Sequence, residues 1–251
     1  MTATPVRMDG LFDGEPLPFD GVCPVCSGNF DVTRLREPVR VCGCGAGRRA
    51  MELAAAFLQE WAHGIHATVR ALAADATIPH PRVLDLSLDP VLPQAITLAD
   101  RLTRGNPFGP EAALRLPQPV DPVDLAALPA ADASVDVVFL RDVLFWVPEL
   151  TALVHEVGRV LAPGGHAVFQ ETFAWQFPDE TVEAGGGAAL PLRAGGGTRM
   201  PERRIIGADF LDLLATVGLR AYGYRPGLSV DPLYRNLLIV AVRDGAPVSK
   251  A

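Results

Sequence analysis

The 251-residue chain lacks an excess of positive charge, because 22 basic side chains stand against 29 acidic ones, for a formal net charge of −7. Proteins bind nucleic acid mainly through Lys and Arg contacts to phosphates, so this balance argues against a general nucleic-acid binder. No segment approaches the ~20 apolar residues of a membrane-spanning helix. The first 21 residues are polar and lack the charged start and apolar run of a secretory signal. We therefore expect a cytoplasmic protein without a membrane partner.

Cysteine is scarce, and all four cysteines fall within 22 positions. They form two close pairs, Cys23 with Cys26 and Cys42 with Cys44, separated by fifteen residues. A reducing compartment disfavours disulfides, whereas two close pairs can surround a zinc ion with four thiolates. The second pair is Cys-x-Cys rather than the Cys-x-x-Cys of a zinc ribbon. We predict a closed, structural zinc site, with two pairs of ordinary reduced thiols as the alternative.

Arginines cluster around the cysteines, and Arg48 and Arg49 stand four and five positions after Cys44. They could meet an anionic substrate or RNA, or they could form the solvated face of a small zinc module.

The chain is long enough for one α/β core with a small appendage. We assign the N-terminal tail and the cysteine module to residues 1–49, and the main domain to residues 50–251. An irregular insertion at about 172–204 contains two triple-glycine runs. This composition is typical either of a lid over a substrate or of a surface loop.

Hydrophobic periodicity predicts the main elements. Leu53, Phe57, Trp61 and Ile65 are spaced by four and predict one apolar helix stripe within residues 50–74. Short apolar runs indicate buried strands, and amphipathic segments indicate helices between them. The strands are expected at 82–87, 135–140, 166–171, 219–224 and 237–242, and the helices at 149–161 and 209–217.

The second half of this pattern resembles a known family. The turn around Asp124, the strand at 135–140, the helix at 149–161, the Pro163-Gly164-Gly165 turn and the next strand are similar to class I S-adenosylmethionine (SAM) dependent methyltransferases of the type 11 kind. The Asp89-Pro90 pair and the cysteines resemble a branch with an N-terminal zinc ribbon. The resemblance runs from Cys23 to about Gly223. It implies a Rossmann-like α/β fold, with a seven-stranded methyltransferase sheet, helices on both faces and a small four-cysteine zinc-binding module in front.

The resemblance also implies a cofactor site at the carboxyl ends of the strands. Asp124 and Leu125 would contact the adenine, although Asp124 could instead cap a turn. The region that should carry a ribose-binding acid shows no clear second strand and offers only Asn106 or Glu111. The first loop, residues 86–90, contains none of the expected glycines. The residues expected to bind SAM are Asp85, Leu86, Ser87, Asn106, Asp124, Leu125 and Arg141.

Two acidic residues are candidates for catalysis. Glu171 ends the fifth strand of the family pattern, where ligands collect in open α/β sheets, and is the predicted general base. Asp142 is the second candidate. Phe145 and Trp146 stand where the family usually has an acidic residue and a histidine. The apolar wall that they form suits an aromatic or hydrophobic acceptor, or a site that has lost catalysis.

The sequence therefore predicts SAM-dependent methyl transfer to oxygen or nitrogen of a small-molecule acceptor. A catalytically degenerate binding or scaffold subunit with a protein partner is the alternative, favoured by the missing glycines and the missing second-strand acid. An RNA base methyltransferase is a third hypothesis, because some of these enzymes join a zinc knuckle to this fold. The net acidity argues against it.

Overall fold

The computed structural model describes most of the chain, and all structural statements below concern its described residues. These are residues 21–31, 41–61, 63–87, 89, 91–97, 99–108, 120–174, 179–183, 191–193, 199–201, 204–224 and 234–245. Across these ranges, none of the helices combines the length and apolar character of a membrane span.

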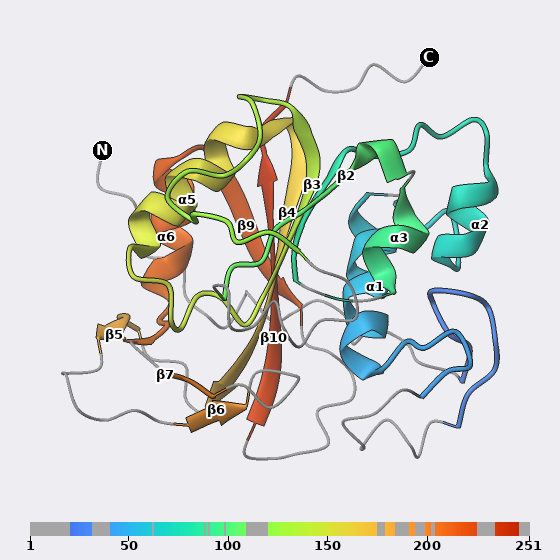
Figure 1. Ribbon diagram of the computed structural model, residues 1–251, viewed down its shortest axis with the longest axis horizontal. Coiled ribbons are helices and arrows are strands. Elements are labelled where there is room, and N and C mark those ends of the chain that lie inside the picture. Colours follow the sequence, from blue (N-terminus) through green and yellow to red (C-terminus); the bar gives the residue numbers. More distant parts are fainter. Residues whose placement is uncertain are drawn as a thin grey trace.

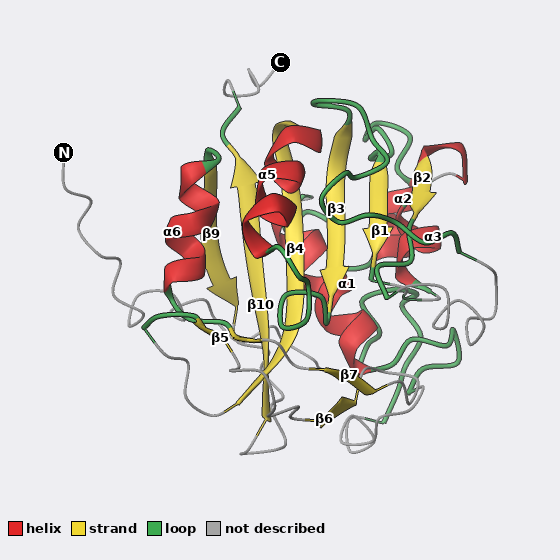
Figure 2. Cartoon of the chain, turned by 60° about the vertical axis from the view of Figure 1, so that its left-hand side comes forward, coloured by secondary structure: helices red, strands yellow, loops and turns green. Residues whose placement is uncertain are grey.

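A mixed sheet of six strands forms the centre of the fold, in the order β2-β1-β3-β4-β10-β9 (Figure 2). The first four strands are parallel, and β10 runs antiparallel to both of its neighbours. Among the described residues, the central sheet thus has one strand fewer than the seven expected. The sheet strands are β1 (Val83–Leu86), β2 (Leu102–Arg104), β3 (Val135–Arg141), β4 (Leu161–Ala174), β9 (Leu219–Tyr224) and β10 (Tyr234–Arg243).

Helices cover both faces of the sheet, as Figure 1 shows with α5 and α6 on one side and α1, α2 and α3 on the other. Their bounds are α1 (Arg48–Glu60), α2 (Val69–Ala74), α3 (Leu92–Ile96), α5 (Leu150–Val160) and α6 (Asp209–Thr216), with a short 3-10 turn at Ala99–Arg101. Alternate residues of a strand therefore enter different cores. In β3, Val138 packs with α5 and α6, whereas Phe139 packs with α1. Burial on both faces explains why residues 137–140 of β3 are a continuous apolar run.

The insertion after β4 carries two small antiparallel pairs. β5 (Val182–Glu183) pairs with β8 (Arg204–Ile205), and β6 (Pro191–Arg193) pairs with β7 (Arg199–Pro201). Much of the predicted insertion at 172–204 lies outside the described residues.

Two predictions for the first half of the chain were wrong. The helical region at 50–74 is two helices, and α1 ends at Glu60, so Ile65 leaves the apolar stripe and is 72% exposed. The second strand does exist, as β2, and it ends at Arg104. At three residues, β2 is too short to show a hydrophobic period in the sequence.

The cysteine segment packs against the main domain. Cys23, Val25 and Cys42 are buried in the same core as α1 and β1. Backbone amides at the start of α2 also donate to the carbonyls of Pro24 and Val25. The expected boundary after residue 49 falls within the first turn of α1.

Candidate functional site

Charged side chains gather where β1, β2, β3 and β4 end at their carboxyl termini. In open α/β sheets this edge is where ligands bind. Two neighbouring groups occupy it: one around the loop that follows β1, and one around Asp142 and Glu171.

Asp85, in β1, is fully buried and pairs with the arginine that ends β2. Its Oδ2 accepts from Arg104 Nε at 3.0 Å, and its Oδ1 accepts from the backbone amide and hydroxyl of Ser87. Burial raises the pKa of Asp85, while the Ser87 hydrogen bonds and the Arg104 charge oppose the rise.

In the first loop, where glycines were expected, the Asp89 side chain makes most of the polar contacts. Its Oδ1 accepts from the amides of Val91 and Leu92, each at 2.9 Å, and so caps the start of α3. Its Oδ2 accepts from Arg141 Nη1 at 2.9 Å, and its backbone carbonyl accepts from Arg104. Asp89 is only 3% exposed. The chain's own carboxylate therefore occupies donors that a carboxylate ligand would use.

Asp142 lies directly after β3 with its backbone in the left-handed region, at φ 55°. Its two carboxylate oxygens accept from both terminal nitrogens of Arg49, at 2.5 and 2.8 Å. This two-pronged geometry is among the stronger hydrogen-bonded ion pairs in proteins.

Glu171, in β4, is buried beside this pair. Its Oε1 accepts from the amides of Val143 and Leu144 at 2.9 and 3.0 Å. Its Oε2 is buried and has no hydrogen-bond partner among the described residues. Burial, and then the charge of Asp142, raise the pKa of Glu171 to about 8, against the lowering effect of the two amides and Arg49. At neutral pH the carboxyl group is mostly protonated.

An aromatic pair borders Asp142. Trp146 donates its indole N–H to the Asp142 carbonyl at 2.9 Å, and its ring lies 5.4 Å from that of Phe108 between centroids. Phe145 is 5% exposed and faces the core. Of the two aromatic residues in the predicted wall, Trp146 is therefore the one that is partly exposed.

The residues expected to contact the adenine and ribose form none of the ion pairs described above. Asp124 is exposed and accepts from the Ala126 amide at 2.9 Å, which forms a local turn. Leu125 and Leu86 are buried in the core with α5 and α6. Asn106 is fully buried, and its side-chain oxygen accepts from the Phe108 amide. Glu111 lies outside the described residues. The roles of these residues as SAM ligands stay predictions.

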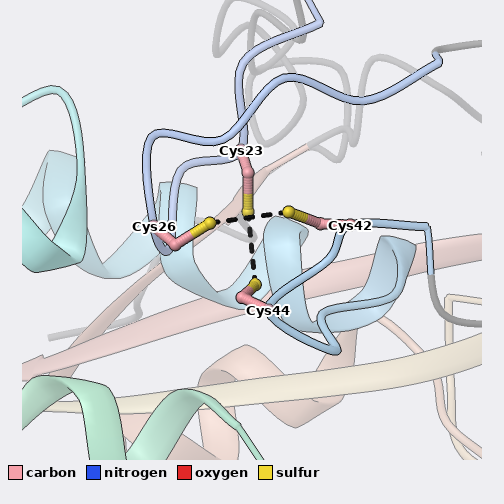
Figure 3. A group of neighbouring side chains, drawn as sticks. All are labelled: Cys23, Cys26, Cys42 and Cys44. Atoms are coloured by element: carbon pink, nitrogen blue, oxygen red, sulfur yellow. Dashed lines mark hydrogen bonds between the residues drawn. The ribbon is translucent and has the colours of Figure 1, made fainter.

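The four cysteines converge. Their Sγ atoms all lie within 4.8 Å of one another and point toward a common centre (Figure 3). Cys23 and Cys44 are separated by 3.9 Å, and Cys26 and Cys42 by 3.5 Å. Thiolates bound at ~2.3 Å around a tetrahedral zinc ion lie about 3.8 Å apart, so the set fits this metal.

The surroundings of the sulfurs also fit a metal centre. The Gly28 amide donates to Cys26 Sγ at 3.4 Å, the kind of outer hydrogen bond that orients a ligand. Burial raises the pKa of Cys23 and, to about 11, that of Cys44. A bound zinc ion would displace these protons.

Residues 93–169 match the family model described as a methyltransferase domain. This segment is therefore similar to a methyltransferase domain. The matched segment runs from α3 through β2, β3 and α5 into β4, and it includes Asp142. The central sheet of parallel strands with an antiparallel β10, covered by helices, confirms the expected α/β fold, with six sheet strands among the described residues.

Solved structures similar to this chain share little sequence with it. A SAM-dependent methyltransferase from Mesorhizobium loti is 18% identical, with a TM-score of 0.43, covering 70% of this chain and 98% of its own. A SAM-dependent methyltransferase from Methanosarcina mazei is 14% identical, with a TM-score of 0.43, covering 67% and 95%. A Haloferax volcanii complex that contains a methyltransferase activator includes a chain that is 14% identical, with a TM-score of 0.41. The match covers 79% of this chain and 94% of that one. No curated protein matches the chain.

The methyltransferase family supports SAM as the methyl donor, and the first loop fits its amino-acid end by charge. The SAM carboxylate requires donors, and Arg104 and Arg141 keep 17% and 16% of their side chains exposed. The SAM ammonium requires acceptors, and Asp85 and Asp89 lie beside these arginines. SAM would bind here by exchanging its own charges with the internal ion pairs, rather than by lying on glycines.

Sequence patterns do not reveal three charged residues of this site. Asp89 stands out only through its place in a family motif, Arg104 ends a strand too short to detect, and Arg49 lies among arginines that the sequence assigns to a charged patch. The first turn of α1 turns Arg49 inward instead, toward a partner 93 positions away.

Proposed function

We propose that this chain is a SAM-dependent methyltransferase that acts on oxygen or nitrogen of a small-molecule acceptor. The methyltransferase domain match supports the reaction class. The observation that carries the proposal is the buried pair of Glu171 and Asp142 at the strand ends, with Glu171 Oε2 lacking a hydrogen-bond partner in the described part of the chain. An acceptor O–H or N–H would supply the missing partner.

The residues of this edge can align an acceptor and remove its proton. When bound, SAM supplies an activated methyl group on its sulfonium sulfur. Transfer of this group is an in-line displacement that depends mainly on alignment. Glu171 would accept the acceptor's proton at Oε2 while its Oε1 stays fixed by two amides. Because only the deprotonated carboxylate is a base, this step would quicken as the pH rises toward about 8.

The contact between Trp146 and Phe108 supports a planar, weakly polar acceptor. Trp146 is tied to the Asp142 carbonyl and its ring is supported by Phe108, so a flat apolar surface borders the acidic pair. Aromatic acceptors favour offset contacts with such rings. The acidic net charge gives no comparable support to an RNA acceptor.

A second candidate function is supported by Asp89. Its carboxylate already caps α3 and pairs with Arg141, so the chain imitates a bound anionic ligand. If this pair never opens, the fold is a degenerate methyltransferase that binds or shapes a protein partner instead of SAM.

Calorimetric titration with SAM and S-adenosylhomocysteine distinguishes the two functions. An enzyme should bind at micromolar Kd, or about −8 kcal/mol. Asp89→Asn should then weaken binding about tenfold by removing an acceptor for the ligand ammonium. In the degenerate protein the wild type gives no heat, and Asp89→Asn gains binding because Arg141 is released.

The matched control is Asp132→Asn, which also breaks an aspartate–arginine pair, here with Arg159 at 2.7 Å. Asp132 precedes β3, on the opposite edge of the sheet from Asp142, so ligand binding should not change. Absence of binding by all three proteins would refute the enzymatic proposal.

A further inference from the structure

The helix α1 joins the cysteine cluster to the acidic pair. It begins at Arg48, four positions after Cys44, with Gly47 as its N-terminal cap residue. The connecting turn is closed by backbone hydrogen bonds, since the amides of Val41 and Cys42 both donate to the Ala46 carbonyl. Ala46 is fully buried. The place of the first turn of α1 is therefore set by the loop that carries the second cysteine pair.

That first turn is attached to β3 and β4 by polar contacts. Arg49 holds Asp142 with two hydrogen bonds and donates a third to the Gln170 carbonyl at 3.3 Å. In return, Gln170 donates its side-chain amide to the Arg49 carbonyl at 3.1 Å and to Glu52 at 2.9 Å. Helix α1 thus contacts both strands that carry the acidic pair.

Helix stability does not explain an arginine at this position. The first turn of a helix bears a partial positive charge, which disfavours cations. The Nε of Arg49 is also buried without a hydrogen-bond partner among the described residues. Asp142 provides the compensation, because its carboxylate accepts from both terminal nitrogens of Arg49.

We propose that Arg49 is a positioning residue for the Glu171–Asp142 pair and that the metal-bound cysteine module holds Arg49 in place. The metal centre is then part of the architecture of the acceptor site. The catalytic meaning of this inference rests on the proposed methyl transfer, but the placement of Arg49 does not.

Arg49 should alter the titration of the pair. Among the described residues, the groups that contact the two carboxyls or act on their charge are Arg49 of α1 and the amides of Val143 and Leu144. Arg49 contributes a positive charge. Without it, less positive charge opposes protonation of Glu171, and the upper apparent pKa, that of Glu171, rises.

Infrared titration of the full-length zinc-loaded protein measures this effect without an acceptor. The band of the protonated carboxyl is assigned by its loss in Glu171→Gln. We expect Arg49→Gln to raise the upper apparent pKa by about one unit, and Arg49→Lys to restore part of the wild-type value. The matched control is Arg48→Gln, which removes the same charge from the same turn. Arg48 pairs with Glu52, at 3.5 Å, and not with Asp142. It should leave the titration unchanged.

Metal removal tests the second half of the proposal. Chelation of the wild type should reproduce the shift caused by Arg49→Gln, and chelation of Arg49→Gln should add nothing. An unchanged titration in folded Arg49→Gln would overturn the positioning role, and an unchanged titration after chelation would overturn the role of the metal. If Arg49→Gln fails to fold, Arg49→Lys provides the test of the positioning role. It keeps the positive charge but loses the paired hydrogen bonds to Asp142. If the titration shifts as expected but the protein binds neither SAM nor S-adenosylhomocysteine, the positioning role of Arg49 stands and only the proposed methyltransferase activity is refuted.

Discussion

The acidic residues at the strand ends are stabilised in two different ways. Asp85, Asp89 and Asp142 each accept hydrogen bonds from an arginine, with Arg104, Arg141 and Arg49 as the respective partners. Glu171 is held by backbone amides instead. Amide dipoles compensate a buried charge less than a guanidinium does, and burial raises the pKa of Glu171 to about 8.

Glu171 should make stability depend on pH. Its folded pKa of about 8 lies above the ordinary value of 4.5, so the folded state binds the extra proton between these values. The stabilisation is fully present below pH 4.5 and is lost as the pH rises through about 8. Each unit corresponds to about 1.4 kcal/mol, so the loss amounts to a few kcal/mol. Glu171→Gln should flatten this decline in denaturant unfolding between pH 5 and 8.5. Parallel curves would contradict it, and exposed Glu149→Gln is the control.

At the scale of elements, the insertion after β4 is anchored onto the loop that carries the aromatic pair. Arg204, in β8, is 4% exposed and donates to the carbonyls of Leu144, Val147 and Pro148 and to Glu183. Its own amide donates to the Phe145 carbonyl at 3.1 Å. This anchor connects β8 of the insertion to the loop that carries Phe145 and Trp146.

Loss of this anchor should destabilise the fold. Arg204→Met leaves three carbonyls without their donor, and we expect a loss of about 2–3 kcal/mol in urea unfolding. Cleavage of the insertion by protease should also accelerate. The control is Arg82→Met, because Arg82 is 46% exposed and pairs with Asp136, and its loss should change stability by about 1 kcal/mol or less. Equal effects of the two substitutions would exclude a special role for Arg204.

At the scale of the whole molecule, the cysteine cluster and the sheet share one hydrophobic core. Cys23 and Cys42 are buried in the same cluster as Phe57 of α1, Phe139 of β3 and Val240 of β10. A change at the sulfurs is therefore transmitted into the packing of the sheet, because protein interiors are close-packed and respond as a unit.

Zinc removal should therefore weaken the entire domain in one step. We expect one zinc ion per chain by elemental analysis, and a fall of more than about 5 °C in a single thermal transition after chelation. Added zinc should restore the transition, and magnesium should not. Cys42→Ser should behave like the chelated protein. Two separate transitions, with the upper one unchanged by chelation, would show that the module folds independently of the sheet.

The sequence by itself determined the features that depend on local pattern. Apolar runs located β3 and β4, the period of α5 was visible, and close spacing alone indicated that the four cysteines converge. Tertiary structure decided the features that depend on distant neighbours: the three-residue β2, the end of α1 that exposes Ile65, and the contact of Arg49 with Asp142. The physical reason is that hydrophobic periodicity is encoded over a few residues, whereas an ion pair forms only where the packed sheet brings two strand or helix ends together.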